Sequence, residues 1–209
     1  MKISHLLVFA SFFSLAMAFT SCEESKEENE YHDWKARNEH FIDSIADVAS
    51  KNVDGNWLIL KAHTLGDDFG MDQDHRYYVY AQAVENGEGE YQPVYNDSVR
   101  VHYSGRLIPS ASYPTGYNFD KSYSTTTLDV LTDVPTLFCP NQLVVGFATA
   151  VMHMVEGDRW KVYIPSYLAY GEKGTTGIPK HSALVYDIQL ARIYKYGIDK
   201  DTSWHAKRR

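Results

Sequence analysis

The sequence predicts an α+β fold in which an antiparallel sheet wraps on one short helix, preceded by a helical extension. Two observations support this prediction. Several segments alternate apolar and polar residues with the period of two that half-buried strands show. Two other segments repeat apolar residues every three to four positions, as amphipathic helices do. With 209 residues, 44% of them hydrophobic, the chain is long enough for one domain with an accessory segment.

Residues 1–21 are predicted to be a signal peptide. Lys2 is the only charged residue before Cys22, and the apolar stretch between them is short for a membrane span. The junction "AFTSC" resembles the lipobox of bacterial lipoproteins, which implies cleavage before Cys22 and attachment of lipid to its thiol. We therefore expect an extracytoplasmic protein that contacts the membrane through its lipid anchor only, facing the periplasm or the cell surface. The alternative is an ordinary secreted protein with an unrelated cysteine.

The charge balance argues against a nucleic-acid partner. The chain has 20 basic and 27 acidic residues, and removal of residues 1–21 takes away one lysine and no acid. No basic stripe is left to meet phosphates. The acidic run after the lipidated cysteine is expected to be a solvated tether over residues 22–30. Cys139 would then be the only unmodified thiol, which leaves no internal disulfide.

The segment 31–75 is expected to form an N-terminal extension with an amphipathic helix over residues 31–52 and a strand over 56–63. The apolar stripe of the helix consists of Trp34, Phe41, Ile42, Ile45, Val48 and Ala49, and Gly55 is expected to end it. An amphipathic helix this short needs a surface to cover its stripe. That surface belongs either to the chain's own domain or to a second copy of the chain in a homodimer. The aspartate-rich loop that follows lacks the central glycine and closing glutamate of a calcium-binding loop.

From residue 76 onward strands dominate the pattern. Alternation predicts them over the segments 76–84, 98–105, 158–165 and 182–193, with a weaker candidate at 128–139. One helix interrupts them between Asn141 and Met154, where apolar residues stand at i, i+3, i+4, i+7 and i+8. The tail 196–209 is polar and is expected to fray.

Common catalytic patterns are missing from the sequence. It contains no G-x-S-x-G and no H-E-x-x-H, and its nine histidines include no close pair at metal-binding spacing, so no metal or other cofactor is expected. The glycines of "GEKGTTG" precede neither a helix nor a Lys-Ser/Thr pair, which argues against a phosphate-binding loop. Asp120 and Asp187 are left as a carboxylate pair for glycoside hydrolysis, because sequence alone does not say whether they meet in space.

Three blocks within residues 76–195 resemble, in order, those of the FKBP-type peptidyl-prolyl cis-trans isomerases. The blocks are "VRVHYSGRL", "NFDKS" and "QLVVGFATAVMHMVEGDRWKVYIPSYLAYGEKGTTGIPKHSALVYDIQL". The resemblance implies an isomerase domain over 76–195, built as a twisted antiparallel sheet half-wrapped around one short helix. It also implies that the proline ring of a polypeptide substrate enters an aromatic pocket between sheet and helix.

The resemblance further implies which residues form the site. The expected catalytic residues are Tyr103, Phe119, Asp120 and Tyr170, and the expected substrate-binding residues are Leu143, Val144, Phe147, Ile178 and Tyr186. In the family, the tyrosine matched by Tyr170 and the backbone N–H matched by Val144 each hold a substrate carbonyl. The glycine loop after Tyr170 is then the flap beside the pocket. For each aromatic residue taken singly, ordinary core packing is the alternative.

The sequence also departs from the family pattern. The segment between Phe119 and the helix is longer than usual, lacks the arginine that commonly partners the pocket acid, and places Val134 about where a pocket phenylalanine is expected. Two functional hypotheses follow. The chain is a prolyl isomerase acting on X-Pro bonds of exported polypeptides, or it is a binding module or chaperone on the same fold with little isomerase activity.

Overall fold

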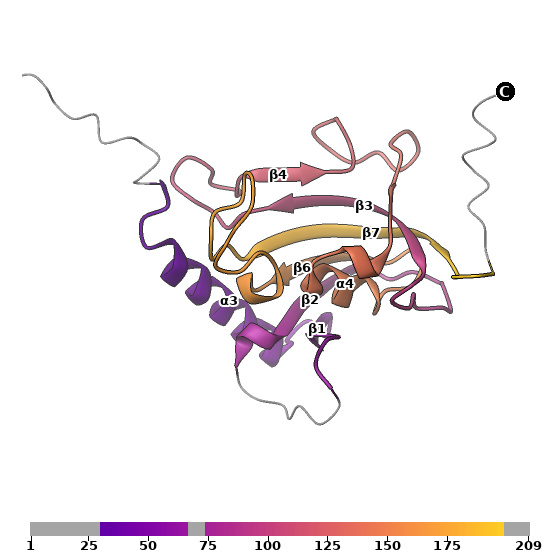
Figure 1. The fold of residues 1–209 in the computed structure, drawn as a ribbon, viewed down its shortest axis with the longest axis horizontal. Helices are drawn as coiled ribbons and strands as arrows, with labels where there is room; N and C mark the ends of the chain where they lie inside the picture. Colours follow the sequence, from indigo (N-terminus) through magenta and orange to yellow (C-terminus); the bar gives the residue numbers. More distant parts are fainter. Residues whose placement is uncertain (1–29, 67–73, 199–209) are drawn as a thin grey trace, which may run out of the picture. The chain divides into compact units, whose positions relative to one another are not determined.

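The computed structural model describes residues 30–66 and 74–198 (Figure 1). The predicted signal peptide, Cys22 and most of the tether and tail lie outside the described residues. From Asp33 onward the chain forms one compact unit. Its helices are α3 (Trp34–Lys51) and α4 (Val145–Val151), its 3₁₀ turns are η1 (His75–Tyr77), η2 (Pro140–Gln142) and η3 (Ser166–Leu168), and its strands are β1 (Trp57–Lys61), β2 (Tyr78–Glu85), β3 (Ser98–Arg106), β4 (Asn118–Lys121), β5 (Thr136–Phe138), β6 (Arg159–Ile164) and β7 (Leu184–Tyr194).

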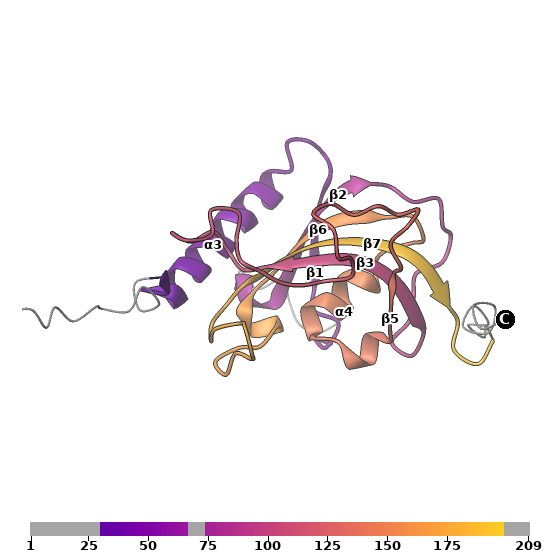
Figure 2. The ribbon, with the colours of Figure 1, turned by 90° about the horizontal axis from the view of Figure 1, so that it is seen from above.

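The strands form one antiparallel sheet in the order β1-β2-β6-β7-β3-β4, and β5 pairs with β3. Helix α4 lies on one face of this sheet, called the inner face below, and α3 lies on the opposite, outer face (Figure 2). The strand of the expected N-terminal extension, β1, is hydrogen-bonded to β2 and forms the edge of the same sheet. This arrangement confirms the predicted α+β class, with an antiparallel sheet, one short helix and a helical segment before them.

Alternation along β7 assigns its side chains to the two faces. Tyr186 and Ile188 are buried on the inner face, where the ring of Tyr186 contacts Phe147 of α4. Asp187 is therefore on the outer face. The close approach of α4 to the sheet depends on Gly146, because a Cβ there would lie only 2.2 Å from Cγ2 of Ile164.

Helix α3 docks on the chain's own sheet rather than standing free. The Nε1–H of Trp34 donates a hydrogen bond to Ser182 Oγ at 2.8 Å. The Oδ1 of Asn38 accepts one from the backbone N–H of Ala183 at 2.8 Å. The predicted stripe is only partly right for this reason: Asn38 is 2% exposed, whereas Val48 is 49% exposed. A polar side chain can be buried when a backbone group pairs with it.

Three smaller expectations differ from the structure. The helix ends at Asn52, whose left-handed φ of 40° terminates it, and not at Gly55. Within the candidate strand 128–139 only β5 is extended, because most of that segment forms a loop. Strand β4 was not predicted, since its four residues give too short an alternation to recognise. Among the described residues no helix is both long and apolar enough to cross a membrane.

Candidate active site

Five aromatic rings meet on the inner face of the sheet, between the sheet and α4. The members of this aromatic cluster are Tyr103 of β3, Phe119 of β4, Phe138 of β5, Phe147 of α4 and Tyr186 of β7. Ring centroids lie 4.9 Å apart for Phe147 and Tyr186, 5.6 Å for Tyr103 and Phe138, and 5.7 Å for Phe119 and Tyr186. Most of these pairs are tilted or edge-to-face, the geometry that the ring quadrupole favours. Together the rings form an apolar wall suited to a flat aliphatic ring.

Gly105 explains why the rings can approach the sheet so closely. A Cβ at this position would lie 2.6 Å from Cε1 of Tyr186 and 2.7 Å from the ring of Phe119. Contacts that short do not occur between real atoms, so any larger residue would displace both rings. The glycine of the "VHYSG" motif is therefore part of the cluster's construction.

The polar edge of the cluster is formed by Asp120. The Tyr103 hydroxyl donates a hydrogen bond of 2.8 Å to Oδ2 of Asp120. Burial, reinforced by this carboxylate, raises the pKa of Tyr103, so its hydroxyl stays protonated and remains a donor. The segment after Asp120 is held in place because Ser122 exchanges hydrogen bonds of 2.9 Å with the backbone N–H and C=O of Tyr103.

Tyr170 stands on the open side of the cluster. It lies two residues beyond the end of η3 and is 36% exposed. Burial raises the pKa of Tyr186, and the charges of Tyr170 and Asp120 add to that shift. Left-handed glycines at 171, 174 and 177 let the chain turn sharply beyond it. The backbone N–H of His181 donates to the C=O of Gly171 at 2.7 Å and closes this flap loop.

The other expected binding residues are in the flap loop and at the start of α4. Ile178 is 4% exposed and forms an isolated β-bridge with Thr175 in the flap loop. Leu143 and Val144 are half-buried at the start of α4, where Val144 is the N-cap with φ −60° and ψ 146°. The backbone N–H of an N-cap residue has no partner within its own helix. Of the expected binding residues, Phe147 and Tyr186 are in the cluster, and Leu143 and Val144 directly precede the helix that carries Phe147.

Phe138 is the residue that sequence reasoning missed. Its ring contacts those of Tyr103 and Phe147, whereas Val134, placed near this position from the sequence, is 57% exposed in the loop before β5. An aromatic ring is therefore present at this place in the cluster, and it comes from Phe138 rather than from position 134. The "TLF" alternation just before Cys139 was the available signal, but the unusual length of the segment obscured the match.

The carboxylate pair considered for glycoside hydrolysis is not formed. Asp120 binds Tyr103 on the inner face. Asp187 lies on the outer face, where both of its oxygens accept hydrogen bonds of 2.9 Å from Arg159. Two carboxylates on opposite faces of a sheet cannot flank one glycosidic bond. Within the described residues, no group of three or more His, Cys, Asp or Glu side chains is arranged to hold a metal ion.

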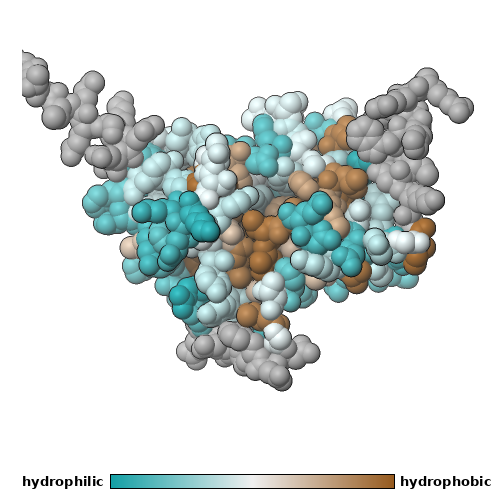
Figure 3. Space-filling model, viewed as in Figure 1, coloured by the Kyte–Doolittle hydropathy of each residue, from teal (hydrophilic) through white to brown (hydrophobic). Residues whose placement is uncertain are grey.

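The surface in this region is more hydrophobic than its surroundings. Figure 3 shows hydrophobic residues in the middle of the view, where α4 and the flap loop lie in Figure 1, with hydrophilic residues around them. Binding sites for small apolar groups usually combine an apolar surface with a few polar groups at its edge.

Comparison with known proteins gives the same assignment. Residues 89–191 match the family model of the FKBP-type peptidyl-prolyl cis-trans isomerase. The chain is 38% identical over 113 residues to a macrophage infectivity potentiator of Trypanosoma cruzi, covering 54% of this chain and 51% of that protein. It is 36% identical over 113 residues to an FKBP-type 22 kDa peptidyl-prolyl cis-trans isomerase of Escherichia coli, covering 54% and 48%.

The chain thus spans about half the length of these relatives. The crystal structure of a peptidyl-prolyl cis-trans isomerase from Pseudomonas syringae shares the fold, with a TM-score of 0.51 at 23% identity, over 76% of this chain and 95% of that one. The motifs, the sheet with its single short inner helix and the family match over residues 89–191 agree. This segment belongs to the FKBP-type peptidyl-prolyl cis-trans isomerase family.

Proposed function

We propose that the chain is a peptidyl-prolyl cis-trans isomerase that rotates X-Pro imide bonds without covalent chemistry. The observation that supports this most strongly is the aromatic cluster with the Tyr103–Asp120 hydrogen bond at its edge. The cluster offers the proline ring an apolar surface, and Asp120 and Tyr170 supply polar groups beside it. No nucleophile or proton relay is required for this reaction.

The physical task is to lower a rotational barrier. Rotation about a peptide C–N bond costs about 18–20 kcal/mol because resonance is lost in the twisted state. Uncatalysed X-Pro bonds therefore need tens to hundreds of seconds to isomerise. An apolar environment disfavours the charge-separated resonance form that keeps the bond planar, and so favours the twisted form relative to the planar one. Lowering the barrier by about 5 kcal/mol would accelerate rotation by roughly three to four powers of ten.

Each polar group has a separate part in this proposal. The Tyr170 hydroxyl and the Val144 backbone N–H hold the carbonyls on either side of the rotating bond, so that only the imide turns. Asp120 keeps the Tyr103 hydroxyl oriented and accepts hydrogen bonds at the pocket edge. Phe119, Phe147, Ile178 and Tyr186, with Phe138, contact the proline ring, while Leu143 lines the approach beside Val144.

The test is cis-trans exchange of a short Leu-Pro-Phe peptide, followed by NMR with catalytic amounts of the chain. The wild type is compared with Asp120→Ala and Tyr170→Phe, and with Tyr196→Phe as a matched control, since Tyr196 is 75% exposed. We expect faster exchange with the wild type and the control, and a loss in the two pocket variants. If the folded wild type leaves exchange unchanged, the isomerase proposal is wrong and a binding module becomes the better description.

We also propose that exported polypeptides are the substrates and that a lipid on Cys22 tethers the protein at an extracytoplasmic membrane. The support is the sequence of residues 1–22, with its single charge, apolar stretch and lipobox-like end. Incorporation of labelled fatty acid during expression in a bacterial host tests it. Cys22→Ser should abolish labelling and membrane association, while Cys139→Ser should leave both intact. Equal labelling of the two variants would disprove the anchor.

A further inference from the structure

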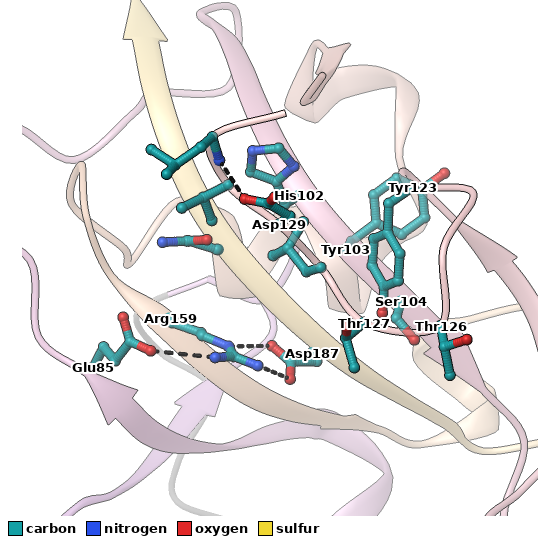
Figure 4. A pocket seen from close by; sticks show the side chains of 14 residues that line it. Glu85, His102, Tyr103, Ser104, Tyr123, Thr126, Thr127, Asp129, Arg159 and Asp187 are labelled. Atoms are coloured by element: carbon teal, nitrogen blue, oxygen red, sulfur yellow. Dashed lines mark hydrogen bonds and ion pairs between the residues drawn. The ribbon is translucent and has the colours of Figure 1, made fainter. Parts of the chain in front are cut away.

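A second pocket lies on the outer face of the sheet, away from the aromatic cluster. It has a volume of about 640 Å³ and is covered by the loop of residues 123–131, the long segment noted in the sequence. Four strands contribute side chains to its floor. These side chains include Glu85, His102, Arg159 and Asp187 (Figure 4). Neighbouring residues on β3 and β7 point to the other face, and Tyr103 is the member of the aromatic cluster that also lines this pocket.

The pocket floor contains more carboxylate groups than its one arginine can neutralise. Arg159 is bound by both oxygens of Asp187 at 2.9 Å and by Oε1 of Glu85 at 3.2 Å, which neutralises its charge (Figure 4). Asp129 adds a third carboxylate from the loop, where its Oδ1 accepts the N–H of Leu131 at 3.0 Å. Three carboxylates against one guanidinium give the lining an excess of negative charge. Anionic ligands are therefore disfavoured in this pocket.

His102 is a buried member of the pocket lining. It lines the pocket, is 3% exposed, and its buried Nδ1 has no hydrogen-bond partner in the part of the chain that the structure describes. A buried polar atom without a partner costs stability and is uncommon in native proteins. Burial lowers the pKa of His102, so the imidazole is neutral near pH 7 and adds no positive charge to the pocket lining.

The rim of the pocket is apolar. Val130 is 52% exposed and Leu131 is 91% exposed, and both line the pocket together with the half-buried Leu128. An apolar rim around an acidic floor matches a chain in which a basic side chain is flanked by apolar ones. The volume exceeds what one lysine side chain fills and suits a short extended segment.

We propose that this outer pocket binds polypeptide segments in which a lysine is flanked by apolar residues. The lysine ammonium enters among Glu85, Asp129 and Asp187, and the apolar neighbours contact Leu128, Val130 and Leu131. The site is separate from the proposed isomerase activity, because it lies on the other face of the sheet and requires no proline. Either function can therefore be present without the other.

The test is a titration of the isotope-labelled full chain with the proline-free peptide acetyl-Gly-Leu-Lys-Leu-Gly-amide, followed by NMR. The same peptide with norleucine in place of lysine is the ligand control. We expect the lysine peptide to shift amide signals of His102 and of the 123–131 loop, with those of Tyr170 and the flap unchanged. Raising the salt from about 50 to about 300 mM should weaken the binding, as exposed ion pairs are screened.

The matched variants are Glu85→Gln with Asp129→Asn, and Asp47→Asn with Asp54→Asn at exposed positions outside the pocket. Both pairs remove two charges. The first should raise the Kd about fivefold, and the second less than about twofold. Equal binding of the norleucine peptide, an equal loss in both variants, or shifts confined to the flap would each overturn the proposal. So would a neutral oligosaccharide that shifts the loop signals when the lysine peptide does not.

Discussion

The Tyr103 hydroxyl binds Asp120 at 2.8 Å across neighbouring antiparallel strands, in which Gly105 is the direct partner of Asp120. This bond joins the apolar wall of the candidate active site to its polar edge. We expect Tyr103→Phe and Asp120→Ala each to lower kcat/KM about tenfold, because either change leaves the other group without its partner. The double variant should lose little more, and a coupling energy of about 1 kcal/mol is expected. Fully additive losses in the peptide exchange assay would contradict a shared role.

The second prediction concerns Gly105. Substitution by alanine should push the rings of Phe119 and Tyr186 aside, costing about 1–3 kcal/mol of unfolding free energy and most of the isomerase activity. Gly66→Ala is the matched control, because a Cβ there meets nothing within 4 Å. Urea unfolding and the exchange assay measure the two effects. An active, fully stable Gly105→Ala variant would mean that the rings are not held as described.

The third prediction separates Phe138 from Val134. Phe138→Ala removes a ring that contacts Tyr103 and Phe147, and should lower kcat/KM about five- to tenfold, mostly through KM. Val134→Ala changes an exposed residue and should leave both constants unchanged. Comparison of the two with a series of X-Pro peptides tests the assignment. The reverse ranking would restore the match at Val134 that the sequence suggested.

The fourth prediction concerns the docking of α3. Asn38→Ala leaves the buried N–H of Ala183 without an acceptor and should lower the unfolding free energy by about 1–3 kcal/mol. Asp47→Ala, on the exposed side of the same helix, should change it by less than about 0.5 kcal/mol. The measurement is the midpoint of urea unfolding, compared between variants that have the same m-value. Equal effects would show that the helix is held by other contacts.

The fifth prediction is a loss of stability in mild acid. Burial lowers the pKa of His63 and of His102 below the ordinary 6.5. The unfolded chain therefore takes up protons at a pH where the folded chain does not, and stability should fall as the pH drops below about 6.5 toward the folded pKa values. Thermal unfolding at pH 7.5 and 5.5 measures this. His63→Gln should reduce the difference in Tm between the two pH values, and His40→Gln, at an exposed position, should not.

The helices and strands that could be predicted are those with one buried and one exposed face, because such faces impose a regular pattern of apolar and polar residues on the sequence. The eleven residues of β7 alternate between a packed face and an open one, and their composition reflects it. Asn38 could not be predicted as buried, because its partner Ala183 is 145 residues away and belongs to the tertiary fold. Phe138 was missed for a similar reason. Its place is fixed by pairing of β5 with β3, whereas counting along a long intervening loop pointed to Val134. The outer pocket left no recognisable motif, since each strand contributes only one to three of its residues.

The pairing of β3 with β7 has a consequence for how the chain tolerates length changes. Ser104 pairs with Asp187 on the outer face, and the next pair, Gly105 with Tyr186, belongs to the aromatic cluster. Side chains alternate between the two faces along each strand, so the position of a residue in the strand decides which face its side chain is on. A one-residue deletion in the middle of either strand would move the side chains beyond it to the opposite face, whereas a two-residue deletion would keep every side chain on its own face. The two sites thus use alternate residues of the same strands. A register shift of one residue in either strand would therefore disrupt both sites.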